Sequence, residues 1–188
     1  MVPVSLAHLW IPILLSALCV FAASSLIHMV LKWHNSDYKG LPNEEEVRAV
    51  LRKGTPAPGQ YVLPYCSDHK DMDKPEMQQK YQDGPVGMLM ISPSGPPAMG
   101  AALAKWFGFS VLVAFMAAYL ASRTLGPGTH YLQVFRVVGA VSFIAYGFGT
   151  IPAAIWMGKP WSTVLKDLAD ALIYGLLSAG VFGWLWPR

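Results

Sequence analysis

The segment Leu9–Leu31, LWIPILLSALCVFAASSLIHMVL, decides the fold class of this chain. It contains no Asp, Glu, Lys or Arg, and about 20 apolar residues are enough for a helix to cross a lipid bilayer. The segment is too long for the apolar core of a signal peptide, and the residues before it lack the positive charge that such a peptide carries. We therefore expect a retained transmembrane helix.

Three further apolar segments are long enough to span a bilayer, and they are Ala101–Ser122, Tyr131–Trp156 and Val164–Trp186. Turns rich in glycine and proline separate them, and all seven tryptophans fall near predicted span ends, where indole rings favour the headgroup region. The sequence thus predicts an all-α membrane protein. Its four-transmembrane-helix bundle would carry a small α+β soluble insert between helices 1 and 2.

The expected organisation has three parts: residues 1–34 hold the first transmembrane helix, 35–100 the soluble insert, and 101–188 helices 2–4. Only 13% of the residues are charged, about half the usual fraction for a soluble domain. The acidic residues lie between Asp37 and Asp83 or at Asp167 and Asp170. This clustering is typical of a membrane protein with one aqueous segment.

Nucleic acid is not an expected partner, because the net charge is only +3 and no basic cluster is interleaved with aromatic residues. The two cysteines, Cys19 and Cys66, are too few for a disulfide framework. The expected surroundings are the lipid bilayer, with self-association or a larger membrane complex as possible arrangements.

The insert has its own secondary-structure pattern. Asn43 before three glutamates predicts a capped helix start, and Arg52-Lys53-Gly54 predicts its end. Short strands are expected at Tyr61–Leu63 and Val86–Ile91, with a second helix at Asp73–Gln82 between them. Ser162 is the expected cap of the last transmembrane helix.

Basic residues indicate the orientation. Of the fourteen Lys and Arg residues, all but Arg123, Arg136 and Arg188 fall on the side that holds the insert. Because cytoplasmic loops carry the excess of Lys and Arg, we expect the insert in the cytoplasm and both termini outside.

Small residues recur every four positions in the last span, at Ala171, Gly175, Ala179 and Gly183. This spacing places them on one face of a helix, here called the small-residue ridge. Helices in lipid associate by close backbone approach, which such ridges permit. The ridge predicts either tight packing within one bundle or a face for homo-oligomerisation.

Ionisable residues inside a span are costly and mark candidate sites. Chain direction puts four of them at similar depth near the insert side: His28, Lys105, Asp167 and Asp170. A hydrogen bond from His28 to Asp170, or an Asp170–Lys105 pair, would satisfy them within the bundle. The cluster predicts a polar clasp that fixes helix register, with a proton or cation site and simple interfacial exposure as the alternatives.

No complete catalytic, metal or cofactor motif is present in the sequence. Cys66 and His69 form half of a zinc-type pair with no second half, to which His34 could add a ligand. His8 and His130 both lie at the opposite edge from His28, so a haem held by two histidines is not expected. We expect no catalytic residues and no cofactor.

Four segments carry a resemblance: IHMVLKWHNSDYKGLP, SRTLGPG, GKPW and the terminal GWLWPR. With them the chain resembles a group of small bacterial four-span membrane proteins of unknown function. The resemblance implies a multi-pass protein of the bacterial inner membrane, and it implies no reaction and no site residues.

Two functional hypotheses follow. The first is a non-enzymatic accessory, scaffold or oligomeric membrane component, which the small-residue ridge favours. The second is a small oligomeric channel or transporter for protons or a small solute, in which His28, Tyr146 and Asp170 line a polar path. An enzyme acting on a lipid or quinone is a third, more distant hypothesis, and it would need Cys66 or His69 to face a cleft.

Overall fold

The computed structural model describes residues 4–188, so positions 1–3 of the first predicted part lie outside the described residues. The chain divides into two compact units. The first contains the segment up to Tyr38 together with Ala98–Ala154 and Lys159–Arg188. The second contains Lys39–Pro97 with Ile155–Gly158.

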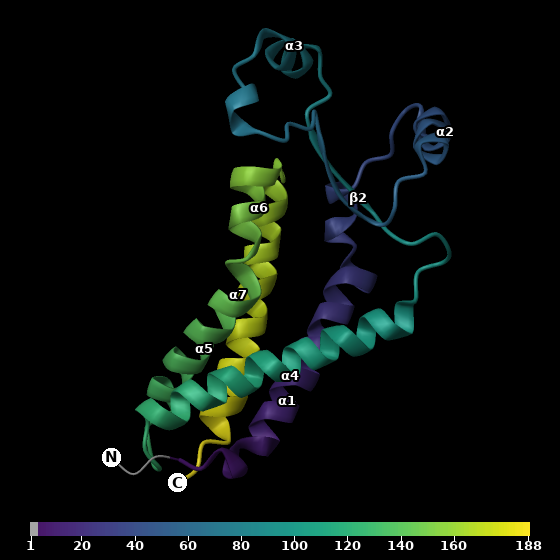
Figure 1. Ribbon diagram of the computed structural model, residues 1–188. Coiled ribbons are helices and arrows are strands. Elements are labelled where there is room, and N and C mark those ends of the chain that lie inside the picture. Colours follow the sequence, from purple (N-terminus) through teal and green to yellow (C-terminus); the bar gives the residue numbers. More distant parts are fainter. Residues whose placement is uncertain (1–3) are drawn as a thin grey trace. The chain divides into compact units, whose positions relative to one another are not determined.

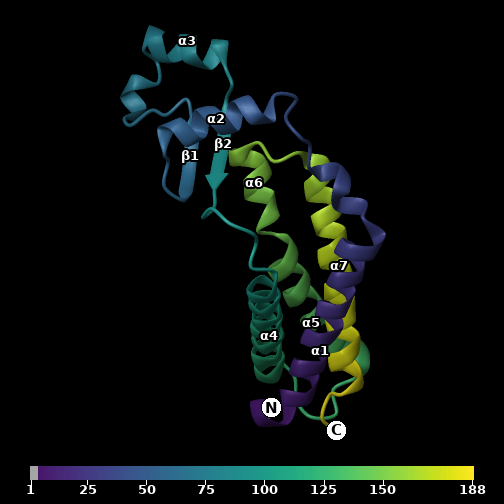
Figure 2. The same ribbon diagram turned by 90° about the vertical axis from the view of Figure 1, so that its right-hand side faces the viewer.

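The first unit is entirely helical (Figures 1 and 2). Helix α1 spans Trp10–Ser25 and continues as a π-helical segment, Leu26–Leu31. Helix α4 spans Met99–Thr124, α5 spans Tyr131–Gly147, α6 spans Thr150–Met157 and α7 spans Trp161–Trp184. A short 3₁₀ helix, Leu6–Leu9, precedes α1, and another, Trp33–Asp37, follows the π-helical segment.

Three helical stretches in the described chain are long and apolar enough to cross a membrane: Leu6–Leu31, Met99–Thr124 and Tyr131–Met157. They correspond to the first three predicted spans, and they make this a membrane protein. Helix α7 is not among them, since Lys166, Asp167 and Asp170 lie in its first half.

Many of the buried positions of the first unit hold small side chains. Ser16, Ala17, Ala117, Ala118 and Ser178 are buried, whereas many large apolar side chains of the same helices point outward. Examples of exposed residues are Leu14, Leu18, Leu112, Phe115 and Leu176. Helices with small interiors and large apolar exteriors are typical of packing in lipid.

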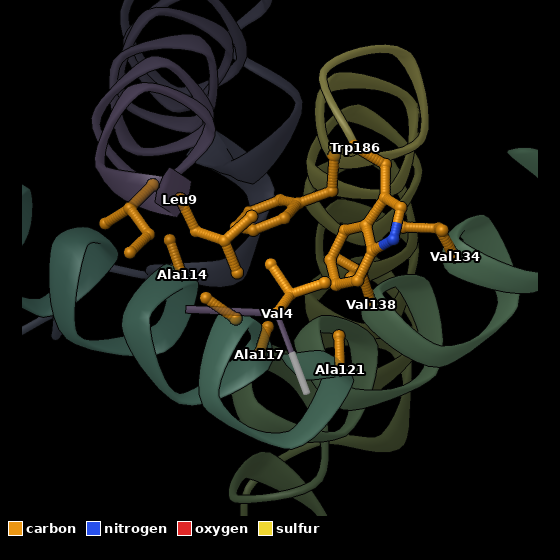
Figure 3. Close-up of a cluster of buried hydrophobic side chains, with 11 residues drawn as sticks. Val4, Leu9, Ala114, Ala117, Ala121, Val134, Val138 and Trp186 are labelled. Atoms are coloured by element: carbon orange, nitrogen blue, oxygen red, sulfur yellow. The ribbon is translucent and has the colours of Figure 1, made fainter. Parts of the chain in front are cut away.

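A buried cluster closes one end of this unit, where the start of α1 meets the end of α7. Figure 3 shows Val4 and Leu9 against alanines of α4, with Val134, Val138 and Trp186 alongside. The Trp186 Nε1 donates a 2.9 Å hydrogen bond to the Gly126 carbonyl. This bond fastens the chain end to the loop between α4 and α5.

The small-residue ridge of α7 packs on α5 of the same chain. A Cβ placed on Gly175 would lie 3.1 Å from the Gly139 carbonyl oxygen, and one on Gly139 would lie 3.2 Å from the Ala179 Cβ. At Gly183 an added Cβ would meet the Tyr131 ring at 2.6 Å. A side chain at any of these positions would force its neighbours to shift, so the ridge packs α7 against α5 within one chain.

The second unit contains helix α2 (Glu44–Gly54), strand β1 (Gly59–Leu63), helix α3 (Pro75–Asp83) and strand β2 (Gly87–Ile91). The strands pair antiparallel, with Tyr61 opposite Leu89. This is the small sheet that the sequence predicts.

Of the two predicted helix caps, Asn43 lies at the N-cap position of α2 without the expected side-chain bond, and Ser162 is wrong. Asn43 precedes α2, but its side chain makes no capping bond and instead donates to the Glu46 carboxylate at 3.4 Å. Helix α7 begins at Trp161 after Pro160, so Ser162 lies inside the helix. Pro160 has extended backbone angles, and its carbonyl accepts bonds from Thr163 and Val164, which start the helix without a side-chain cap.

Candidate functional site

The site begins where α1 ends. His28 lies in the π-helical segment Leu26–Leu31, and π-helical turns occur frequently at functional sites. Lys32 then adopts left-handed backbone angles (φ 53°, ψ 17°), which are uncommon for a residue other than glycine. The helical segment ends there, and the His28 and His34 rings stack with centroids 4.6 Å apart and planes 8° apart.

His34, in the 3₁₀ helix that follows α1, links this segment to α7. Its Nδ1 lies 2.8 Å from Asp37 Oδ2, and its Nε2 lies 2.9 Å from Asp170 Oδ2. The side chain of His34 is only 12% exposed. One largely buried imidazole therefore joins two carboxylates from segments far apart in the sequence.

Lys166 fixes the same turn from the α7 side. Its Nζ donates to Asp37 Oδ1 at 2.6 Å, to the Trp33 carbonyl at 2.8 Å and to Ser36 Oγ at 2.7 Å. The hydrogen bond from Lys166 is the main cause of a lowered pKa of the Asp37 carboxyl. Desolvation acts in the opposite direction, and the hydrogen bond with His34 lowers the pKa further. Asp37 is thus held as a carboxylate that orients His34.

Asp170 is buried, with a relative exposure of 4% for the whole residue. Its Oδ2 faces His34, and His28 Nε2 approaches the same atom to 3.8 Å. Its Oδ1 has no hydrogen-bond partner within residues 4–188, and neither has the buried hydroxyl of Tyr174, one turn further along α7. Buried polar atoms without partners are unusual, and they mark a place where a ligand can supply the missing bond.

A cavity of about 670 Å³ opens beside these groups. Its lining includes Met29, Leu103 and Trp106 as apolar walls, and Tyr146 and Tyr174 as aromatic walls with polar tips. His28, Thr150, Lys159, Asp167 and Asp170 also line it. The Trp106 Nε1 donates a 2.8 Å bond to Ser24 Oγ, which fixes the orientation of the indole between α4 and α1.

A second polar group lies on the cavity wall. Lys159 Nζ and Thr150 Oγ1 both donate to Asp167 Oδ2, and Lys159 also donates to Thr150 at 2.9 Å. The three residues tie the start of α6 to the first half of α7. The cavity wall therefore carries the Lys159–Asp167 ion pair, whose charges compensate each other, and Asp170, one of whose oxygens has no partner within the described residues.

The residues predicted as one polar cluster have different surroundings. The structure places His28 Nε2 3.8 Å from Asp170 Oδ2, close but too far apart for the predicted hydrogen bond, and it pairs Asp167 with Lys159 instead. Lys105 is exposed on α4 and makes no ion pair with any described residue. The alternative pair, Asp170–Lys105, is therefore not formed, because Lys105 is exposed whereas Asp170 is buried.

The incomplete zinc-type pair of the insert is not assembled. The Cys66 thiol donates to the Asp68 carbonyl at 3.0 Å, and His69 Nδ1 faces the Met72 sulfur at 3.3 Å. Within residues 4–188, one group of three metal-ligating side chains is close enough to share an ion, and it consists of His28, His34 and Asp170.

Sequence reasoning missed the central role of His34. The available signal was the spacing His34-x-x-Asp37 directly after a span, which places an imidazole and a carboxylate one 3₁₀ turn apart. No protein-family description, curated protein or solved structure matches this chain, so its site is interpreted from its own geometry.

Proposed function

We propose that the chain is a multi-pass protein whose four spans form one bundle, with α7 as the fourth span. The second half of α7 supports this proposal, because Leu172, Ile173 and Leu176 are exposed there, as side chains facing lipid would be. The polar first half supports it as well, since Asp170 and Lys166 make their contacts within the first unit. Ionisable residues of a span usually turn inward in this way.

We propose further that this bundle binds a small amphipathic molecule, as a binding component of the membrane rather than as an enzyme. The observation that carries the proposal is the cavity of about 670 Å³ with the unpartnered Asp170 Oδ1 on its wall. Small-molecule sites are typically concave, have volumes of about 300–1,000 Å³, and are mostly apolar with a few convergent polar groups.

The lining indicates the kind of molecule. Trp106, Tyr146 and Leu103 offer an apolar or ring-shaped body a surface to pack on. Lys159 and the Tyr174 hydroxyl offer hydrogen-bond donors to a polar end, and Asp170 Oδ1 offers an acceptor. A molecule with an acyl or ring body and an end group that both donates and accepts hydrogen bonds, such as a carboxylic acid or a hydroxyl, fits both halves of the cavity.

The proposed location is the bacterial inner membrane, with the insert in the cytoplasm and both termini outside. The distribution of Lys and Arg supports this orientation, because the basic residues concentrate on the insert side.

A photoreactive fatty acid carrying a diazirine tests the binding proposal in membranes that contain the full chain. In the unaltered protein we expect cross-links on Met29, Leu103 or Trp106. Gly149→Phe should remove most of that labelling, because Gly149 lines the cavity and a Cβ there meets no atom within 4 Å. Gly108→Phe is the matched control, since Gly108 is equally open but lies outside the cavity lining.

Labelling of the three lining residues that is equal in both variants would contradict the proposal. So would labelling confined to lipid-facing residues such as Leu112. A thermal melt of each variant in detergent checks that the added ring leaves the helices folded.

A further inference from the structure

We propose that His28, His34 and Asp170 bind a divalent transition-metal ion such as Zn²⁺. Each residue offers one ligand atom, and these atoms all lie within 4.8 Å of one another. Two imidazole nitrogens and one carboxylate are a common ligand set for zinc and for iron(II) in proteins. The site comes from two segments of the first unit, the turn after α1 and the middle of α7.

The surroundings of His34 prepare it as a ligand. A metal-binding histidine usually donates its other ring nitrogen to a carboxylate or a carbonyl, which fixes the tautomer and the ring orientation. His34 Nδ1 lies 2.8 Å from Asp37 Oδ2, and Lys166 holds Asp37 from its other oxygen at 2.6 Å. Nε2 of His34 is then the nitrogen whose lone pair can face an ion.

His28 has the same arrangement with a carbonyl in place of the carboxylate. Its Nδ1 lies 3.0 Å from the Ser24 carbonyl oxygen, so Nδ1 is the donor and Nε2 carries the lone pair. Both histidines therefore offer Nε2, and both Nε2 atoms face Asp170 Oδ2.

The distances suit a tetrahedral ion after a small adjustment. Zinc bonds of about 2.0–2.2 Å at tetrahedral angles separate neighbouring ligand atoms by about 3.4 Å. The observed separations from Asp170 Oδ2 are 2.9 Å for His34 and 3.8 Å for His28, on either side of that value. The two stacked rings must fan apart to aim at one ion, and the His28 side chain, 52% exposed, has room to tilt.

Among the three ligands, Asp170 would be stabilised most by a bound ion. An ionised carboxylate is costly to bury unless it is paired, and one of its oxygens has no partner within the described residues. Without an ion, the short contact between His34 Nε2 and Asp170 Oδ2 needs a shared proton, and an ion bound between the two atoms takes its place.

Three protein ligands leave a fourth position open, as in zinc sites that bind a water or a substrate. His28 and Asp170 both line the cavity, and Lys166 already balances the charge of Asp37. A dication bound to Asp170 keeps one positive charge, which favours an anionic end group on the bound molecule. This last step, unlike the metal site itself, rests on the proposed function.

The test uses the purified full chain in detergent, stripped with a chelator and titrated with Zn²⁺ by calorimetry and with Co²⁺ by visible absorption. We expect one ion per chain and the strong visible bands of tetrahedral Co²⁺. His34→Ala and Asp170→Asn should abolish binding, and Asp37→Asn should weaken it by about 10–100-fold by releasing the His34 ring. His69→Ala is the matched control, because His69 belongs to the insert, and it should bind as the unaltered chain does.

His28→Ala removes the third ligand at a half-exposed position, so we expect the variant to fold and to bind the ion more weakly. A chain that binds no ion, or one whose binding is lost in His69→Ala and kept in His28→Ala, overturns the metal site. Photolabelling of the chelator-treated chain separates this outcome from the proposed function, because labelling of the cavity without metal tests the cavity alone.

Discussion

At the scale of single residues, the site depends on an imidazole placed between two carboxylates. The contact between His34 and Asp170 joins positions that are 136 residues apart. The contacts of Lys166 with Asp37, Ser36 and the Trp33 carbonyl repeat the same connection a turn earlier on α7. Five side chains and one backbone carbonyl thus decide how the segment after α1 is fastened to α7.

Asp37→Asn should lower the melting temperature at neutral pH, because Asp37 is stabilised as a carboxylate by Lys166 and His34. A group with a lowered pKa in the folded state adds stability above its unfolded pKa, here its ordinary value of 3.8. That contribution disappears as the pH falls through the lowered value. The difference between the two proteins should therefore be full at pH 7 and shrink below about pH 3.8.

Thermal melts in detergent across this pH range measure the difference, with Asp68→Asn in the insert as the control. A gap between Asp37→Asn and the unaltered chain that stays constant down to the lowest pH would contradict the assignment.

At the scale of elements, α7 has two faces with separate tasks. Its small-residue ridge packs closely against the backbone of α5. Lys166 and Asp170 bind the 3₁₀ segment after α1, and Asp167 binds Thr150 and Lys159 at the two ends of α6. The helix can be polar in its first half because those charges have partners inside the unit.

Gly175→Ala should destabilise the protein by about 1–3 kcal/mol, the usual range for overpacking. The added Cβ would lie 3.1 Å from the Gly139 carbonyl and 3.3 Å from the Phe143 backbone nitrogen, which cannot move without shifting α5. Gly180→Ala is the matched control on the same helix. Its Cβ would meet Tyr131 at an ordinary 3.9 Å, and alanine is favoured over glycine in a helix by about 0.5–1 kcal/mol.

Equilibrium unfolding in mixed micelles compares the two variants. Equal stability of Gly175→Ala and Gly180→Ala would show that α5 and α7 do not pack through the ridge.

At the scale of the whole molecule, the number of spans decides on which side of the membrane each end lies. With α7 as a fourth span, the C-terminus and the insert lie on opposite faces of the membrane. With only the three apolar stretches as spans, they share one face.

An impermeant maleimide should distinguish these arrangements in a Cys19→Ser background. In intact spheroplasts we expect no labelling of Cys66 and strong labelling of Arg188→Cys, the latter in a chain that also carries Cys66→Ser. Inverted vesicles should give the reverse pattern. Labelling of both positions from the same face would rule out the fourth span, and labelling of Cys66 in intact spheroplasts would reverse the proposed orientation.

The sequence by itself determined the three apolar membrane helices, the helical character of the rest of the first unit and the small two-stranded sheet. These features follow from properties of short windows, namely continuous apolarity, turn residues and strand-forming runs, and such signals are local. The proximity of His28 and Asp170 was also expected from the sequence, and their side chains approach to 3.8 Å. The packing role of the ridge was one of two alternatives that the four-residue spacing allowed.

Only the tertiary structure decided which charged groups meet. The left-handed Lys32 ends the helical segment, and His34 in the following 3₁₀ helix lies between Asp37 and Asp170, while Lys105 is exposed and Asp167 pairs with Lys159. The sequence contains no local signal for these contacts, because they depend on the rotation of each helix about its axis and on the backbone angles of a single residue. The physical reason is that burial in lipid is fixed one segment at a time, whereas a polar site is fixed by the mutual packing of several segments.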